Sequence, residues 1–146
     1  MAAIRELGPQ ETYLAYPAAL ELRPHLSSLE AFVEQVNQEQ RPEGYRLMGS
    51  FEDDVEDAAA IAGFRTGHML ARGFYLNVDD LSTRAAFRKR GHAGRLMEWL
   101  IEEARRLGCV QLHLDSNVYR YDAHRLYLNQ RMDITAHHFT RGLSPT

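Results

Sequence analysis

The chain has 146 residues, a length that suits one domain, and its formal net charge at pH 7 is −3. Hydrophobic residues make up 45% and charged residues 25%, as in ordinary globular proteins, and no apolar stretch approaches the roughly 20 residues that span a bilayer. This composition excludes a disordered chain and a membrane-spanning one. The small negative charge also argues against a general nucleic-acid binder.

The charge is unevenly distributed along the chain. Residues 1–83 hold 6 basic and 14 acidic side chains, a net charge of −8, whereas residues 84–146 hold 11 basic and 6 acidic ones, a net charge of +5. The only lysine, Lys89, stands between Arg88 and Arg90. The C-terminal half therefore contains a concentrated basic cluster.

The cysteine content and the N-terminal residues bear on the cellular compartment. Cys109 is the only cysteine, so an intramolecular disulfide is impossible. Arg5 and Glu6 interrupt the place where a signal peptide would need an apolar run. We therefore expect a cytoplasmic protein that is not exported.

In chain order, the first half predicts two helices and then an antiparallel hairpin. Residues 10–22 and 27–40 have helical character, and Ser27 or Ser28 can cap the second helix. Strands 45–51 and 58–66 follow, joined by an acidic turn that we expect to be a solvated loop. A second hairpin is expected next, with residues 74–83 as its second strand because apolar and polar residues alternate there.

The second half predicts a strand–helix–strand unit. Residues 92–107 have the apolar spacing of an amphipathic helix, Gly108 ends that helix, and residues 109–115 alternate as a strand. The short connections predict that strands 74–83 and 109–115 are parallel. A helix over 121–130 and a last strand over 132–140 complete an α+β fold. Its mixed sheet is expected to be mostly antiparallel and parallel at its centre, with helices on both faces.

The segment between strand 74–83 and helix 92–107 predicts an anion site. Gly91 and Gly94 allow the backbone to approach a ligand, and the first amide groups of a helix have no intrahelical acceptor. Cations at a helix N-terminus oppose the helix dipole, so the basic cluster there favours an anionic partner. A turn with a solvated basic rim is the structural alternative.

Two familiar phosphate sites do not fit this segment. The chain lacks the GxxxxGK[ST] pattern of a Walker A loop. The dinucleotide fingerprint GxGxxG would need a glycine between Phe87 and Lys89, and only one strand–helix–strand unit is present. The histidines lack the spacing of a zinc site, so no metal is expected.

Several motifs together resemble the GCN5-related N-acetyltransferases (GNAT family). Arg88, Gly91 and Ala93 match the family's [QR]xxGx[GA] loop, and Asn77–Thr83 resembles the strand that precedes it. Residues 123–127, Ala-His-Arg-Leu-Tyr, are similar to the AxxLY pattern of the later helix. The motifs occur in the family's order and spacing, so the resemblance implies a GNAT-like fold and a single N-acetyltransferase domain over residues 1–146.

The sequence departs from the family pattern at two positions. Arg120 stands where an asparagine is often found, and Arg131 replaces the glycine of the usual Y-x-x-x-G-[FY] ending. The first departure puts in doubt a hydrogen bond that the family's asparagine would make to a cofactor. The second changes the turn into the last strand. Neither removes the loop or Tyr127.

The resemblance implies acetyl-CoA as co-substrate and a set of residues that bind it. The pyrophosphate would lie on the loop, the pantetheine arm would lie between strands 74–83 and 109–115, and an amide near Leu81 would stabilise the oxyanion. The cofactor-binding residues implied are Leu81, Ser82, Thr83, Arg88, Lys89, Arg90, Gly91, His92, Ala93, Gly94 and Tyr127.

The reaction implied is attack of an amine on a thioester. A lysine-like amine with a pKa of about 10.4 is almost fully protonated at pH 7, so it needs a base or a lowered pKa. Tyr127 resembles the family's general acid for the departing thiolate. The base is left open between Asp79, which we favour, Asp80, His124, Asp115 and a water chain.

Two functions remain open at the level of sequence. One is an N-acetyltransferase that acts on a primary amine of a small molecule or peptide in a ternary complex. The other is a non-catalytic acyl-CoA-binding or regulatory domain on the same fold. The acidic N-terminal half favours a cationic amine as acceptor, and an edge strand or the last strand could pair two copies.

Overall fold

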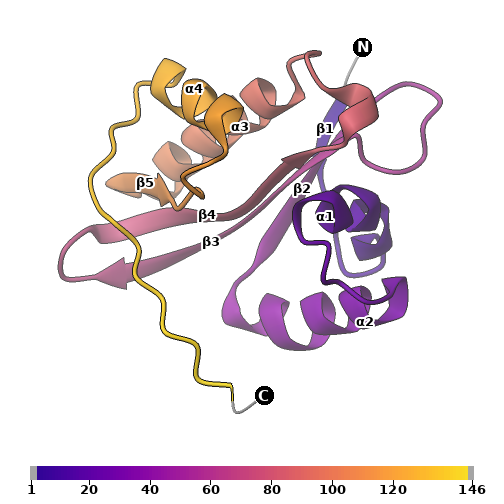
Figure 1. The fold of residues 1–146 in the computed structure, drawn as a ribbon, viewed down its shortest axis with the longest axis horizontal. Coiled ribbons are helices and arrows are strands. Elements are labelled where there is room, and N and C mark those ends of the chain that lie inside the picture. Colours follow the sequence, from indigo (N-terminus) through magenta and orange to yellow (C-terminus); the bar gives the residue numbers. More distant parts are fainter. Residues whose placement is uncertain (1–2, 145–146) are drawn as a thin grey trace. The chain divides into compact units, whose positions relative to one another are not determined.

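The structure is a computed structural model that describes residues 3–144, and these residues form two compact units that divide between Leu114 and Asp115. The first unit contains a mixed sheet and its covering helices (Figure 1). Its strands are β1 (Ala3–Glu6), β2 (Arg46–Phe51), β3 (Ala60–Met69), β4 (Gly73–Thr83) and β5 (Gln111–Leu114). Its α-helices are α1 (Tyr16–Leu22), α2 (Leu29–Glu34) and α3 (His92–Leu107).

Short helical turns extend the α-helices at the start of the chain. A 3₁₀ turn (Thr12–Ala15) leads into α1, and a π-helical turn (Gln35–Gln40) followed by a 3₁₀ turn (Arg41–Glu43) continues α2. Ser28 caps α2, because its Oγ accepts a hydrogen bond from the backbone N–H of Ala31 over 3.1 Å. The two helices expected over 10–22 and 27–40 are thus confirmed.

The five strands lie in sequence order, β1-β2-β3-β4-β5. The first four are antiparallel, and β4 and β5 are parallel, with Tyr75 opposite Gln111 and Val78 opposite Leu114. The predicted hairpins and the parallel pair are therefore confirmed. The parallel pair stands at the edge of this sheet instead of at its centre, because no strand pairs with the outer side of β5 in the described residues.

Two elements differ from the sequence prediction. Strand β1 was not expected, because its residues are mostly exposed and do not alternate between apolar and polar types. The strand expected over 132–140 is wrong, since residues 132–144 form no helix or strand. Ile134 and Phe139 are 82% and 90% exposed, so the alternating apolar residues of this segment have no buried face to occupy.

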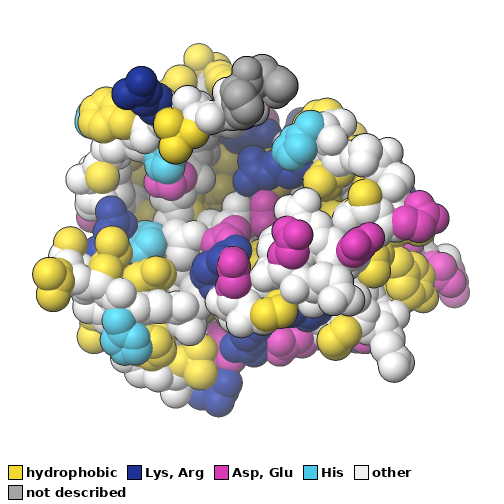
Figure 2. Space-filling model, turned by 90° about the horizontal axis from the view of Figure 1, so that it is seen from below, with side chains coloured by type: hydrophobic (Ala, Val, Ile, Leu, Met, Phe, Trp, Pro, Cys, Tyr) yellow, Lys and Arg dark blue, Asp and Glu magenta, His cyan; other side chains and the backbone are white. Residues whose placement is uncertain are grey.

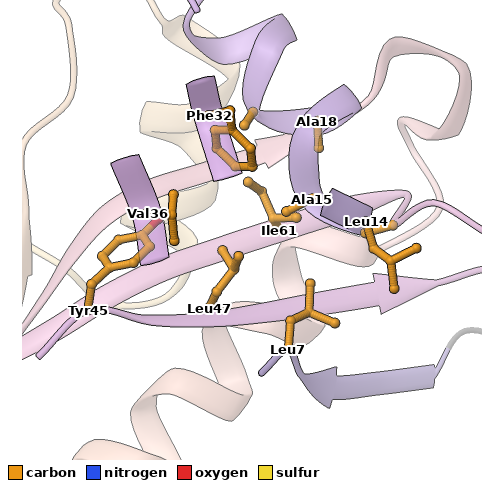
Figure 3. Close-up of a cluster of buried hydrophobic side chains, with 11 residues drawn as sticks. Leu7, Leu14, Ala15, Ala18, Phe32, Val36, Tyr45, Leu47 and Ile61 are labelled. Carbon is orange, nitrogen blue, oxygen red and sulfur yellow. The ribbon is translucent and has the colours of Figure 1, made fainter. Parts of the chain in front are cut away.

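One face of the sheet packs against α1 and α2. Figure 3 shows Leu47 and Ile61 from the strands pointing toward Phe32 of α2 and Ala18 of α1. The buried cluster contains Leu7, Leu14, Ala15, Ala18, Ala19, Phe32, Val36, Tyr45, Leu47, Ala58 and Ile61. Burial of this apolar surface is the main force that holds the first helices on the sheet.

The other face packs against α3. Leu96, Met97 and Leu100 of α3 are fully buried, and Trp99 contacts the ring of Phe64 with centroids 5.8 Å apart. Leu96, Met97 and Leu100 belong to the apolar stripe that predicted the helix, and α3 spans His92–Leu107 as expected. Helices therefore cover both faces of the sheet. Among residues 3–144, none of the helices has the length and hydrophobicity of a membrane span.

The second unit, residues 115–144, contains α4 (Tyr121–Asn129). This helix confirms the one expected over 121–130. Arg131, which stands at the glycine position of the family pattern, follows the helix with a left-handed φ of 63°. The backbone N–H of Met132 donates to the carbonyl of Tyr127 over 3.1 Å, so the helix ends in a hydrogen-bonded turn even without glycine.

Candidate functional site

The loop before α3 has an unusual backbone. A 3₁₀ turn (Ala85–Phe87) leads into it, and both Lys89 (φ 64°) and Gly91 (φ 84°) are left-handed. A Cβ at Gly91 would lie 2.8 Å from Nη1 of Arg95, so a larger residue there must displace that guanidinium. Gly91 is the N-cap of α3, and the loop thus brings its backbone directly to the positive end of the helix dipole.

The amide groups of this loop are available to a ligand. No acceptor among residues 3–144 takes a hydrogen bond from the backbone N–H groups of residues 89–94. The side chains of Arg88 and Arg90 are 62% and 53% exposed, and Lys89 is exposed as well. A row of free amides flanked by three cations is suited to an anionic ligand such as a phosphate group.

Two side chains that the sequence did not place at this loop, Ser50 and Glu52, hold its far end through His92 and Arg90. His92 is fully buried; its Nδ1 lies 2.7 Å from Oγ of Ser50, and its Nε2 lies 2.7 Å from Oε2 of Glu52. Oε1 of Glu52 accepts a hydrogen bond from Nη1 of Arg90 over 3.2 Å. The hydrogen bond from His92 is the main cause that lowers the pKa of Glu52.

Glu52 belongs to the turn that was expected to be solvated, and for this residue the expectation is wrong. The sequence shows that Ser50 and Glu52 are two residues apart and so point to one side of an extended chain. It does not show that this side meets the start of α3. Only the packing of β2 against α3 brings Glu52 to His92.

The sheet opens beside the loop. The last β4–β5 pair is Val78 and Leu114, and residues 79–83 of β4 continue along β3 alone. The backbone of Leu81 and Thr83 therefore lies on the part of β4 that has left β5. The carbonyl of Thr83 accepts a hydrogen bond from Nε of Arg88 over 3.2 Å, which ties this strand end to the basic loop.

The side chain of Ser82 is buried between β4 and α1. It is 8% exposed, and its Oγ donates to the carbonyl of Ala18 over 2.8 Å. Its hydroxyl thus joins β4 to α1. Any contact of Ser82 with the cofactor would come from its backbone.

A bulge in β4 determines where the two aspartates point. Asp80 is opposite Gly63 and Val78 is opposite Phe64, so Asp79 is an extra residue without a partner on β3. As a result, both carboxylates lie on the face that carries α1 and α2. A regular strand would have placed them on opposite faces.

Both aspartates are held by arginines and by neutral donors. Asp79 accepts from Nε of Arg65 over 2.7 Å and from Nδ2 of Asn77 over 2.6 Å. Asp80 accepts from Nη2 of Arg23 over 3.1 Å and from the hydroxyl of Tyr45 over 2.8 Å. Burial and the neighbouring Asp80 raise the pKa of Tyr45 well above its usual value, so this hydroxyl remains a donor.

The remaining predicted residues lie in the second unit. Tyr127 is half-buried on α4, and burial raises the pKa of its hydroxyl. Nε2 of His124 lies 2.9 Å from the carbonyl of Asn117, and Asp115 forms an exposed pair with Nδ1 of His138 over 3.0 Å. Arg120 is the N-cap of α4 and makes no capping hydrogen bond through its side chain.

Two further kinds of reactive group, a metal cluster and an activated thiol, have no counterpart among residues 3–144. No group of three or more His, Cys, Asp or Glu side chains that could hold a metal ion occurs in residues 3–144. Burial, followed by the nearby Glu103, raises the pKa of Cys109. A raised pKa disfavours the thiolate, as expected for a cysteine that is not a nucleophile.

Comparisons with known proteins agree on one family. The sequence pattern of the acetyltransferase (GNAT) family matches residues 10–132. A relative from Bacillus subtilis (strain 168), described as the uncharacterized N-acetyltransferase YhdJ, is 28% identical over 131 residues, which cover 89% of this chain and 90% of that protein.

Solved structures share the fold at low identity. An acetyltransferase from Trypanosoma brucei has a TM-score of 0.82 at 15% identity, with 98% of this chain and 100% of that chain covered. The aminoglycoside N-acetyltransferase AAC(6')-Iy in complex with CoA has a TM-score of 0.83 at 14% identity, with 98% and 95% covered. The same enzyme has been solved with a bisubstrate analog, CoA-S-monomethyl-acetylneamine.

Proposed function

Because the chain belongs to the acetyltransferase (GNAT) family and is an acyltransferase of the N-acetyltransferase type, we propose that it transfers an acetyl group from acetyl-CoA to a primary amine of a small molecule or peptide. The transfer occurs by direct attack within a ternary complex. Residues 1–146 act as one N-acetyltransferase domain.

The observation that carries this proposal is the loop before α3. Its amides at residues 89–94 have no acceptor among residues 3–144, and Arg88, Lys89 and Arg90 flank them. In our proposal they bind the pyrophosphate, with His92, Ala93 and Gly94 contributing backbone N–H groups at the start of α3. The complex of AAC(6')-Iy with CoA supports this choice of ligand on the shared fold.

The pantetheine arm lies along the free part of β4 in this proposal. Residues 79–83 have left β5, so the backbone of Leu81 and Thr83 can form strand-like hydrogen bonds with the arm's amides. The N–H near Leu81 then polarises the acetyl carbonyl and stabilises the oxyanion, a contribution typically worth several kcal/mol.

The chemical step needs two proton transfers. The amine nitrogen attacks the thioester carbon, the C–S bond breaks, and the thiolate takes a proton from Tyr127 while the amine loses one to a base or to water. Burial raises the pKa of Tyr127, so its hydroxyl holds a proton at neutral pH but is a weaker acid; the support for this role is its place in the family's AxxLY pattern.

Asp79 is our candidate for the residue that binds or deprotonates the acceptor amine. Its carboxylate lies 2.7 Å from Nε of Arg65 on the face that carries α1 and α2, where it could hold or deprotonate a cationic amine. Asp80 lies on the same face and is tied to Arg23 and Tyr45. The bisubstrate analog solved with AAC(6')-Iy supports an amine acceptor for this fold.

The test measures CoA release with a thiol reagent across amines, polyamines, amino acids and peptides. We expect turnover with at least one amine, and we expect Tyr127→Phe to lower kcat about a hundredfold without a comparable change in acetyl-CoA affinity. Tyr121→Phe is the matched control, because Tyr121 lies on the same helix and is 66% exposed.

Two results would contradict the proposal. Thermal stabilisation by acetyl-CoA without turnover on any acceptor would refute transfer to an amine. A kcat unchanged by Tyr127→Phe would refute the role of this tyrosine while leaving the transfer itself in place.

A further inference from the structure

We propose that Glu52 is the positioning residue of the cofactor loop: through His92 and Arg90 it holds the loop's amide groups in their binding arrangement before acetyl-CoA arrives. This inference rests on the proposed function, because it assigns a role within the acetyl-CoA site. It concerns a residue that lies outside the loop motif, at the end of β2.

The first step in the argument is that Glu52 contacts both sides of the N-cap of α3. Its Oε1 accepts from Nη1 of Arg90 over 3.2 Å, and its Oε2 lies 2.7 Å from Nε2 of His92. Gly91, the N-cap, lies between these two residues. One carboxylate therefore holds the residues on both sides of Gly91, where the loop continues into the helix.

The second step concerns the hydrogens in this chain of contacts. A carboxylate only accepts, so Nε2 of His92 carries the proton that bonds Glu52. Nη2 of Arg95 approaches Nδ1 of His92 to 3.4 Å, and a guanidinium only donates, which favours Nδ1 as an acceptor for the hydroxyl of Ser50. Both ring nitrogens of His92 then have a hydrogen-bond partner in a fully buried position.

The third step is that the loop needs such support. Lys89 and Gly91 are both left-handed, and a non-glycine residue keeps that conformation only where its surroundings enforce it. Arg95 adds a hydrogen bond from its Nη1 to the carbonyl of Arg90 over 3.1 Å. Glu52, His92, Ser50 and Arg95 thus fix the carbonyl and side-chain positions of the loop and leave its amides free.

The fourth step separates positioning from a direct effect of charge. A carboxylate near a pyrophosphate repels it, so its removal would tighten acetyl-CoA binding if Glu52 acted only through its field. If Glu52 positions the loop, its removal weakens binding instead. The two explanations predict opposite signs.

The experiment compares the full chain with its Glu52→Ala and Glu52→Gln variants. Calorimetry measures the affinities for acetyl-CoA and CoA, and the thiol assay measures kcat and KM. We expect Glu52→Ala to raise the Kd and the KM for acetyl-CoA about tenfold with kcat largely kept. Glu52→Gln still offers an amide oxygen to His92, so we expect it to recover part of the affinity.

Glu56→Ala is the matched control, because Glu56 is an exposed acid of the same turn. It removes the same charge and should leave the Kd unchanged, and far-UV circular dichroism and thermal unfolding check that each variant is folded. An affinity that is unchanged or tighter in a folded Glu52→Ala variant overturns the positioning role. A parent protein that does not bind acetyl-CoA overturns the proposed function instead.

Discussion

Glu103 is a charged residue whose ionisation is built into the fold. It is 6% exposed on α3, and it accepts hydrogen bonds from Nε of Arg106 and Nη1 of Arg46, each over 2.7 Å. The hydrogen bond from Arg106 is the largest effect, burial opposes it, and Arg46 adds to it; together they lower the pKa of Glu103 to about 2. Arg46 also covers the ring of Phe64, with its guanidinium carbon 4.9 Å from the centroid.

A folded-state pKa below the unfolded value makes this contribution depend on pH. It is fully present above the unfolded pKa of about 4.3 and is lost as the pH falls toward 2. We expect Glu103→Gln to lower the free energy of unfolding at pH 7 by about 2 kcal/mol, because it breaks a buried charged pair. Urea unfolding across pH 2 to 7 measures this. As the pH falls, the free energy of unfolding should decrease less steeply for the variant than for the parent protein.

Glu102→Gln is the control for this prediction. Glu102 pairs with Arg105 one helical turn away, but both side chains are more than 70% exposed. An exposed pair contributes little, so we expect a change within about 0.5 kcal/mol. Equal effects of the two substitutions would show that the buried position of Glu103 does not matter.

At the scale of elements, the sequence predicted best where one strong pattern extends over several turns. Helix α3 has the expected bounds because its apolar stripe and the terminal glycines Gly91 and Gly108 all specify the same ends. Strand β1 lacks such a pattern, since it is an exposed edge strand of four residues. The wrong strand at 132–140 shows that alternation alone is insufficient, because a strand also needs a neighbour to pair with.

The two ends of α3 allow a matched test of the loop. Gly91 and Gly108 are both left-handed, with φ of 84° and 87°. We expect Gly91→Val and Gly108→Val each to lower the free energy of unfolding by about 1–2 kcal/mol, because a β-branched residue is strained in this region. Only Gly91→Val should abolish acetyl-CoA binding, since only Gly91 shapes the loop. Calorimetric titration of both variants decides this, and equal loss of binding would refute the pyrophosphate assignment.

At the scale of the whole molecule, the local distribution of charge determines ligand binding more than the net charge does. Acidic side chains gather over the part of the molecule that carries α1 and α2 on the face shown in Figure 2, in keeping with Glu30 and Glu34 of α2. The basic loop could be predicted from the cluster Arg88–Arg90 alone. Its support by Glu52 could not, because that contact joins residues about 40 positions apart through tertiary packing.

A protein of net charge −3 binds a polyanion only through a local concentration of positive charge. The proposed contacts at the exposed Arg88, Lys89 and Arg90 are open to solvent, and the screening length falls from about 10 Å at 0.1 M salt to about 3 Å at 1 M. We therefore expect the Kd for acetyl-CoA to rise several-fold between about 0.05 M and 0.5 M NaCl. Lys89→Gln should weaken binding at low salt and flatten this dependence, because it removes one of the screened charges.

Arg105→Gln is the control, since it removes an exposed cation at the other end of α3 and should leave both the affinity and its salt dependence unchanged. A Kd that does not depend on salt would show that the free amides bind the anion without help from the basic side chains.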